Sequence, residues 1–115
     1  MKTKIDYTFT VLLIVLGVCH TSFTPIFYKV FDLNALWFAG TGMAFVFLGL
    51  INISRLQTTG MLMKILCSIS NALALIFCIL IFLKMAQPQV FISLFILLIL
   101  LGFSLFDLRS SRAIR

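Results

Sequence analysis

Four apolar runs take up almost all of this 115-residue chain and leave few residues to fold in water. The runs are Tyr7–Phe27, Ala35–Ile53, Met61–Leu83 and Val90–Phe106. A helix that crosses a bilayer needs roughly 20 mostly apolar residues, because ~30 Å of hydrocarbon is spanned at ~1.5 Å per residue. We therefore expect an all-α integral membrane protein, in which residues 1–115 form a single membrane domain with these four transmembrane helices.

The composition favours a fold that faces lipid over a soluble one. Hydrophobic residues make up 63% of the chain and charged residues 10%, whereas soluble domains contain roughly 45–50% and 25% of them. A soluble fold of this size could not bury so much apolar surface, but a fold surrounded by lipid does not have to. The main expected partner is therefore the lipid bilayer itself.

Most of the basic residues stand at run ends that face one side of the membrane. Only Lys29 and Lys84 belong to the opposite side. The majority are Lys2, Lys4, Arg55, Lys64, Arg109, Arg112 and Arg115. Because short cytoplasmic loops are rich in Lys and Arg, we expect both termini to be cytoplasmic. The same placement accounts for the net charge of +6 without a nucleic-acid partner.

The connections between the runs are short, which favours antiparallel neighbours and an up-down-up-down four-helix bundle. Asp32 or Asn34 can cap the second helix, and Pro88 stops a continuous helix between the third and fourth runs. We expect a multi-pass protein of a cell membrane, the bacterial inner or plasma membrane. The first run begins like a signal peptide, but it continues to Phe27, beyond the ~7–15 residues of a signal core. We therefore expect a retained first helix.

Small residues indicate where the helices touch. In lipid there is little hydrophobic drive for association, so interfaces favour side chains that let backbones approach. Two runs carry such stripes at helical spacing. The residues are Ala35, Ala39, Gly42 and Gly49 in the second run, and Ser70 and Ala74 in the third.

Several polar side chains fall at a similar depth in the membrane. Counting ~1.5 Å per residue from the inner ends places His20 ~20 Å, Asn71 ~15 Å and Cys78 ~25 Å from the inner boundary. Thr41 reaches the same layer from the outside, and Thr24 adjoins it beside Pro25. The predicted ligand-binding residues are His20, Thr24, Thr41, Asn71 and Cys78.

His20 is the only ionisable side chain deep within a run, and such a group in a membrane is a functional hypothesis by default. The alternative is that neutral His20 only holds the bundle together through a hydrogen bond to Thr41 or Asn71. One histidine without an intramembrane carboxylate does not make a metal site, and no cofactor is expected. Asp6 and Asn52 stand at inner helix ends and receive no function.

Three functions remain as alternatives. The first is a bundle that binds or translocates a small, largely apolar ligand or lipid through a polar pocket in its outer half. The second is a non-catalytic accessory or structural subunit, which implies a homo-oligomer or a partner membrane protein. The third is an intramembrane enzyme that uses His20, ranked last because no nucleophile or oxyanion donors accompany it. The sequence favours a protein that is not an enzyme.

Overall fold

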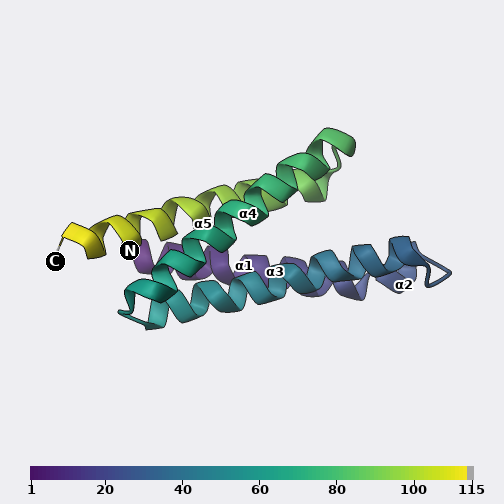
Figure 1. Ribbon diagram of the computed structural model, residues 1–115. Helices are drawn as coiled ribbons and strands as arrows, with labels where there is room; N and C mark the ends of the chain where they lie inside the picture. The colour runs from purple at the N-terminus through teal and green to yellow at the C-terminus, as the bar shows by residue number, and fades with distance from the viewer. Residues whose placement is uncertain (114–115) are drawn as a thin grey trace.

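The computed structural model describes residues 1–113, and within this range the chain forms helices and no strand (Figure 1). The helices are α1 (Lys2–Ser22), α2 (Thr24–Phe27), α3 (Leu33–Gln57), α4 (Met61–Lys84) and α5 (Pro88–Ala113). By length and composition, Lys2–Phe27, α3, α4 and α5 can each cross a membrane. The prediction of an all-α chain with four span-length helices is confirmed. Arg115, counted among the basic residues above, lies outside the described residues.

The helices extend beyond the apolar runs. Hydropathy identifies the residues that suit a lipid environment, but the backbone hydrogen bonds of a helix can continue into polar residues on either side. The helix α1 begins at Lys2, and α5 continues to Ala113. At the start of α3, the side chain of Asp32 accepts a hydrogen bond of 2.9 Å from the backbone N–H of Ala35. Pro88 is the first residue of α5. Proline is tolerated at this position because the backbone N–H of a first helical residue has no partner within the helix.

The first segment long enough to cross a membrane, Lys2–Phe27, is interrupted near its end. The helix α1 stops at Ser22, and Phe23 serves both as its C-cap and as the N-cap of α2. Pro25 lies in the first turn of α2 and cannot donate the backbone hydrogen bond that would join the two helices. This interruption separates the short helix α2 from α1 at one end of the molecule.

The helices form two hairpins that meet at one end and diverge toward the other (Figure 1). The N-terminal hairpin consists of α1, α2 and α3, and the C-terminal hairpin of α4 and α5. They meet where α1 begins and α5 ends, and there Lys2 Nζ lies 3.0 Å from a carboxylate oxygen of Asp107. We call this the closed end. The opposite end, which contains α2 and the turn between α4 and α5, is the open end.

The N-terminal hairpin is packed backbone to backbone through glycines. A Cβ added at Gly17 would lie 2.5 Å from the carbonyl oxygen of Gly42, and one added at Gly42 would lie 2.6 Å from that of Gly17. At Gly49 an added Cβ would collide with the side chain of Ile14. Thr21 Oγ1 also donates a hydrogen bond of 3.2 Å to the carbonyl of Ala39. The small residues of α3 therefore contact α1 of the same chain.

The two hairpins share an apolar core near the middle of the molecule. Leu13 of α1, Leu48 of α3 and Leu97 of α5 are buried in one cluster, and Phe9 and Phe95 pack edge to face at 6.0 Å. Elsewhere large apolar side chains are exposed along the helices, as a lipid-facing surface requires. Toward the open end the cluster continues through Cys78 of α4 and Val90 of α5, within the C-terminal hairpin, and the two hairpins diverge there (Figure 1).

Candidate functional site

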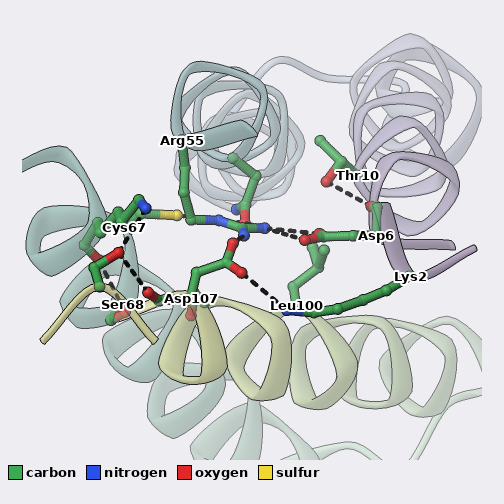
Figure 2. A network of polar contacts seen from close by, with 12 residues as sticks. Lys2, Asp6, Thr10, Arg55, Cys67, Ser68, Leu100 and Asp107 are labelled. Atoms are coloured by element: carbon green, nitrogen blue, oxygen red, sulfur yellow. Dashed lines mark hydrogen bonds and ion pairs between the residues drawn. The ribbon is translucent and has the colours of Figure 1, made fainter. Parts of the chain in front are cut away.

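A buried arginine lies between two carboxylates at the closed end. Arg55 of α3 is 1% exposed. One guanidinium nitrogen, Nη2, lies 2.7 and 2.8 Å from the two carboxylate oxygens of Asp6 on α1. The other, Nη1, is hydrogen-bonded to the carboxylate of Asp107 on α5. Figure 2 shows the guanidinium between these two acids, so a single side chain of α3 links both hairpins.

Asp107 holds a second cation as well. Lys2 Nζ lies 3.0 Å from Asp107 Oδ1 and 3.5 Å from the centre of the Phe106 ring, a cation–π distance. We call Lys2, Asp6, Arg55 and Asp107 the charge cluster. Its two positive and two negative charges balance. The balance matters because an unpaired charge in a low-dielectric interior is far more expensive than a paired one.

Neutral amides extend the polar contacts from the charge cluster toward the middle of the bundle. Asn52 of α3 and Asn71 of α4 are fully buried and hydrogen-bond each other reciprocally, at 2.9 and 3.1 Å. We call them the amide pair. Cys67 Sγ donates to Asn52 Oδ1 at 3.3 Å, and Asn52 Nδ2 also donates to the carbonyl of Leu48 at 2.9 Å. Asn71 Nδ2 also lies 3.5 Å from the carbonyl of Leu100 on α5, so polar groups of α3, α4 and α5 meet here.

The charge cluster and the amide pair are not predicted from the sequence. There Asp6 and Asn52 stand at helix ends without a function, and Arg55 contributes only to the charge bias that sets the topology. The available signal was the position of the charges along the helices: Asp6, Arg55 and Asp107 all stand near helix ends that an up-down-up-down arrangement brings to the same end of the bundle. Opposite charges at one level on three helices can neutralise one another, and this pattern could have predicted the pairing.

A cleft of about 770 Å³ lies between the hairpins at the open end. Its walls combine aromatic residues with an equal number of neutral polar residues. The aromatic residues are Phe27, Tyr28, Trp37, Phe38, Phe45 and Phe77. The polar residues are His20, Asn34, Thr41, Gln87, Gln89 and Ser93. No Lys, Arg, Asp or Glu belongs to the lining, as far as the described chain shows.

The structure brings together three of the five predicted ligand-binding residues. His20, Thr41 and Cys78 line the cleft, whereas Thr24 and Asn71 do not. Thr24 is buried in α2, and within residues 1–113 its hydroxyl has no hydrogen-bond partner. Asn71 belongs to the amide pair, which lies nearer the middle of the bundle. Counting residues along the helices predicts that Asn71 and His20 lie at a similar depth. In the structure α4 diverges from α1 toward the open end (Figure 1), so a similar depth does not bring their side chains together.

His20 makes an aromatic contact rather than the hydrogen bonds considered for it. Its ring stacks on Phe38, with centroids 3.8 Å apart and an interplanar angle of 22°. Thr41 Oγ1 donates instead to the carbonyl of Trp37 at 2.9 Å, and Asn71 bonds Asn52. In the described part of the chain His20 thus forms part of an aromatic wall, with no residue positioned to exchange a proton with it.

A smaller cavity of about 310 Å³ continues from the cleft between α3 and α4. The two share Thr41, Phe77 and Cys78, and the smaller one reaches inward to Leu48 and Ser70. Ser70 and Ala74 line this cavity, so these small residues of α4 leave space beside α3. The carbonyl of Leu48 accepts a hydrogen bond from Asn52, so the cavity ends next to the amide pair.

Among residues 1–113, no group of three or more His, Cys, Asp or Glu side chains could hold a metal ion. We find no protein family, curated protein or solved structure that matches this chain. Since fold alone does not define function, the function is inferred from the residues of the cleft and of the charge cluster.

Proposed function

We propose that the protein is a multi-pass membrane protein that binds, and passes across the bilayer, a small amphipathic molecule with a largely apolar body and a neutral head group. The cleft between the hairpins is its binding site. The closed end faces the cytoplasm with both termini, and the open end faces the other side. The observation that carries the proposal is an aromatic cleft of about 770 Å³ lined by neutral polar groups.

The arrangement of charge supports the placement in the membrane. The closed end carries Lys2, Lys4, Lys64 and the basic residues at the end of α5, whereas the open end carries only Lys29 and Lys84 among the described basic side chains. Positive charge concentrates on the cytoplasmic side of membrane proteins. Trp37 and Tyr28 lie near the open end, where an interfacial aromatic belt is expected.

The lining defines the chemistry of the ligand. Ligand sites typically occupy ~300–1,000 Å³ and combine apolar walls with a few polar groups that fix orientation. Aromatic and aliphatic side chains would hold the body of the ligand, and Asn34, Gln87 and Gln89 near the helix ends would bond its head group. A strongly charged ligand does not fit, because no ionic partner faces the cleft within the described residues.

The test is native mass spectrometry of the protein in lipid nanodiscs with N-phenyl-1-naphthylamine, a neutral aromatic amine, as probe. Thr41→Phe would fill the cleft, and Thr8→Phe is its matched control. Both hydroxyls bond the carbonyl four residues earlier, but Thr8 lies on the exposed face of α1. We expect the affinity for the probe to fall about tenfold in Thr41→Phe alone, equivalent to about 1.4 kcal/mol. Equal adducts in all three proteins would contradict the proposal.

The second candidate is an accessory subunit of a larger membrane complex, and two exposed glycines favour it. A Cβ added at Gly40 or Gly102 would meet nothing within 4 Å, so neither glycine is needed for packing among the described residues. Glycines on the lipid-facing surface of a membrane helix often mark contacts with a partner helix. Gly42 cannot serve this purpose, because it packs against Gly17.

The two candidates predict different responses to Gly102→Leu. If α5 contacts a partner helix, the substitution removes the complex and leaves the cleft intact. Mass measurement of the assembly in nanodiscs decides between them. A particle mass that is the same with and without the substitution, together with undiminished probe binding, favours the binding function.

A further inference from the structure

We propose that the ligand of the cleft is a single-chain lipid with a neutral head group, and that its chain enters sideways from the bilayer to lie between α3 and α4. The inference rests on the proposed function, because it names the class of ligand that the cleft takes and the route by which the ligand arrives. The observation behind it is the smaller cavity that continues from the cleft, which we call the inner groove.

The inner groove follows one face of each of two helices. On α3 its lining residues recur at helical spacing from Thr41 to Ile51, and on α4 they do so from Ser70 to Ile81. Residues three and four positions apart share one face of a helix. At ~1.5 Å per residue the lined stretch of α3 is ~15 Å long, so the groove runs along the helices.

The inner groove has room for one hydrocarbon chain. Its volume of about 310 Å³ over a length of ~15 Å gives a mean cross-section of about 20 Å², close to that of one extended chain. Small side chains border this space, namely those of Ala44 on α3 and of Ser70 and Ala74 on α4. Two acyl chains side by side would not fit, which favours a lipid with a single chain.

The inner groove opens toward lipid. Among residues 1–113 its lining belongs to α3 and α4, so its opening lies between these two helices. Phe47 and Phe77 border the groove although they are 57% and 54% exposed. Residues that both line a cavity and face outward place its opening on the outer surface of the bundle. In a membrane this surface faces hydrocarbon, and a lipid chain can enter without crossing water.

The chemistry of the groove suits hydrocarbon better than water. Its lining is apolar apart from two hydroxyls and one thiol, those of Thr41, Ser70 and Cys78. Thr41 Oγ1 already donates to the carbonyl of Trp37, at 2.9 Å. A buried water needs roughly two to four polar partners, and apolar cavities stay dry. An apolar space that opens to the bilayer is therefore best filled by a lipid chain.

The polar end of the site lies where a lipid head group would be. Asn34 belongs to the first turn of α3, and Gln87 and Gln89 flank Pro88 at the start of α5, so all three stand at the open end. Gln89 Nε2 donates to Gln87 Oε1, which leaves the amide N–H groups of Gln87 and the carbonyl oxygen of Gln89 for a ligand. Amides donate and accept hydrogen bonds but carry no charge, so hydroxyl, ester or amide head groups match them.

The separation of the two ends matches a long chain. From Asn34 to Ile51 the helix α3 rises ~25 Å, within a hydrocarbon layer of ~30 Å. A chain that starts from a head group at Asn34 would pass the aromatic walls of the cleft and end beyond the middle of the bilayer. Phe45 and Phe77 line both the cleft and the groove, and they mark the place where the chain passes from one to the other.

The experiment uses monopalmitin with a diazirine at the end of its acyl chain as the probe. The probe is photoactivated with the protein in phosphatidylcholine nanodiscs, and peptide mass spectrometry locates the label. Ala74→Phe would fill the inner groove. Ala72→Phe is its matched control, because Ala72 is also half-buried on α4 but is outside the lining of both cavities in the described chain. Ala44→Phe, at an exposed lining position, covers the case in which Ala74→Phe does not fold.

We expect the label within residues 41–51 and 70–81, and about tenfold less of it in Ala74→Phe and in Ala44→Phe. Ala72→Phe should stay within about twofold of the unaltered protein. Excess unlabelled monopalmitin should remove the label, whereas hexadecyl sulfate, which has a chain of the same length and a charged head group, should not. Label spread evenly over the exposed faces of the four long helices, equal labelling in all variants, or equal competition by the two lipids would overturn the proposal.

Binding of N-phenyl-1-naphthylamine separates this inference from the proposed function, because the amine tests the cleft alone. If its binding depends on Thr41 while Ala74→Phe leaves the diazirine label unchanged, the proposed function stands and this inference alone is overturned. If Thr41→Phe does not weaken binding of the amine, the proposed function is contradicted. The diazirine label then still reports whether a lipid chain occupies the inner groove.

Discussion

The two ends of this molecule use the same four helices in opposite ways. At the closed end, four charges and two amides bond one another across the hairpins, and Arg55, Asp6, Asn52 and Asn71 are almost completely buried. At the open end, aromatic rings and neutral polar groups line a cleft that the hairpins do not fill. Because lipid gives helices little hydrophobic reason to associate, polar contacts decide where these hairpins join.

Side-chain size reinforces the difference. Gly17, Gly42 and Gly49 allow α1 and α3 to touch along most of their length. Between α3 and α4, large rings such as Phe45 and Phe77 instead face the cleft. One hairpin is therefore closely packed along its length, whereas the contact between the hairpins consists of the charge cluster, the amide pair and the apolar core around Leu13, Leu48 and Leu97.

The largest expected effect comes from removing the central cation. Arg55→Met leaves Asp6 and Asp107 buried or part-buried without their shared partner, which typically costs about 3–5 kcal/mol. We expect a loss of this size in the free energy of unfolding, measured by SDS titration in mixed micelles with circular dichroism. Arg109→Met, an exposed position of α5, should change it by less than about 0.5 kcal/mol. Equal losses would show that the charge cluster does not join the hairpins.

Gly42→Leu should follow in size. A side chain at Gly42 would collide with Thr21 and with the backbone of Gly17, and overpacking of this kind costs about 1–3 kcal/mol or more. Gly102→Leu is the control, because a Cβ there meets no atom within 4 Å. The same unfolding titration compares the two. A tolerated Gly42→Leu would contradict the close packing of α1 on α3.

Much of the fold, but little of the closed end, could be predicted from the sequence. Hydropathy located the four long helices because lipid exposure forces apolar side chains into every span. Hydropathy did not locate the helix ends, because α1 begins at Lys2 and α5 continues past Arg112, in polar segments outside the apolar runs. The charge cluster was missed because Asp6, Arg55 and Asp107 were weighed singly, and their pairing depends on how helices distant in sequence face one another.

The site prediction was limited by the same uncertainty about packing. Depth along a helix can be counted from sequence, and it placed His20, Thr41 and Cys78 at one level, where the cleft contains all three. The direction in which a side chain points depends on helix rotation and tilt, which packing sets. For this reason Asn71 faces Asn52 rather than His20.

The amide pair gives an intermediate effect. A double-mutant cycle of Asn52→Leu and Asn71→Leu isolates their coupling, because each single substitution leaves the other amide with fewer partners. We expect a coupling free energy of about 0.6–1.7 kcal/mol, the range of interhelical hydrogen bonds in membranes. Additive substitutions would mean that the amides do not support the closed end.

The smallest effect on stability is expected for His20→Leu. The ring of His20 stacks on Phe38, and such aromatic contacts contribute about 0.5–1.5 kcal/mol. Stability should therefore fall by about 1 kcal/mol or less, while binding of the amine probe at the cleft should fall more clearly. A loss of stability comparable with that of Arg55→Met would instead make His20 a structural residue.

The most direct test measures the distances between the hairpins at both ends. Spin labels would be placed in a variant whose native cysteines Cys19, Cys67 and Cys78 are replaced by serine. The labelled positions are Gln57 and Ser110 for the closed end, and Leu33 and Ala86 for the open end, all exposed. Pulsed electron paramagnetic resonance in nanodiscs should give a narrow distance distribution at the closed end and a broad one at the open end. Equally narrow distributions, or a broader one at the closed end, would contradict an account in which charge joins one end and leaves the other free to take a ligand.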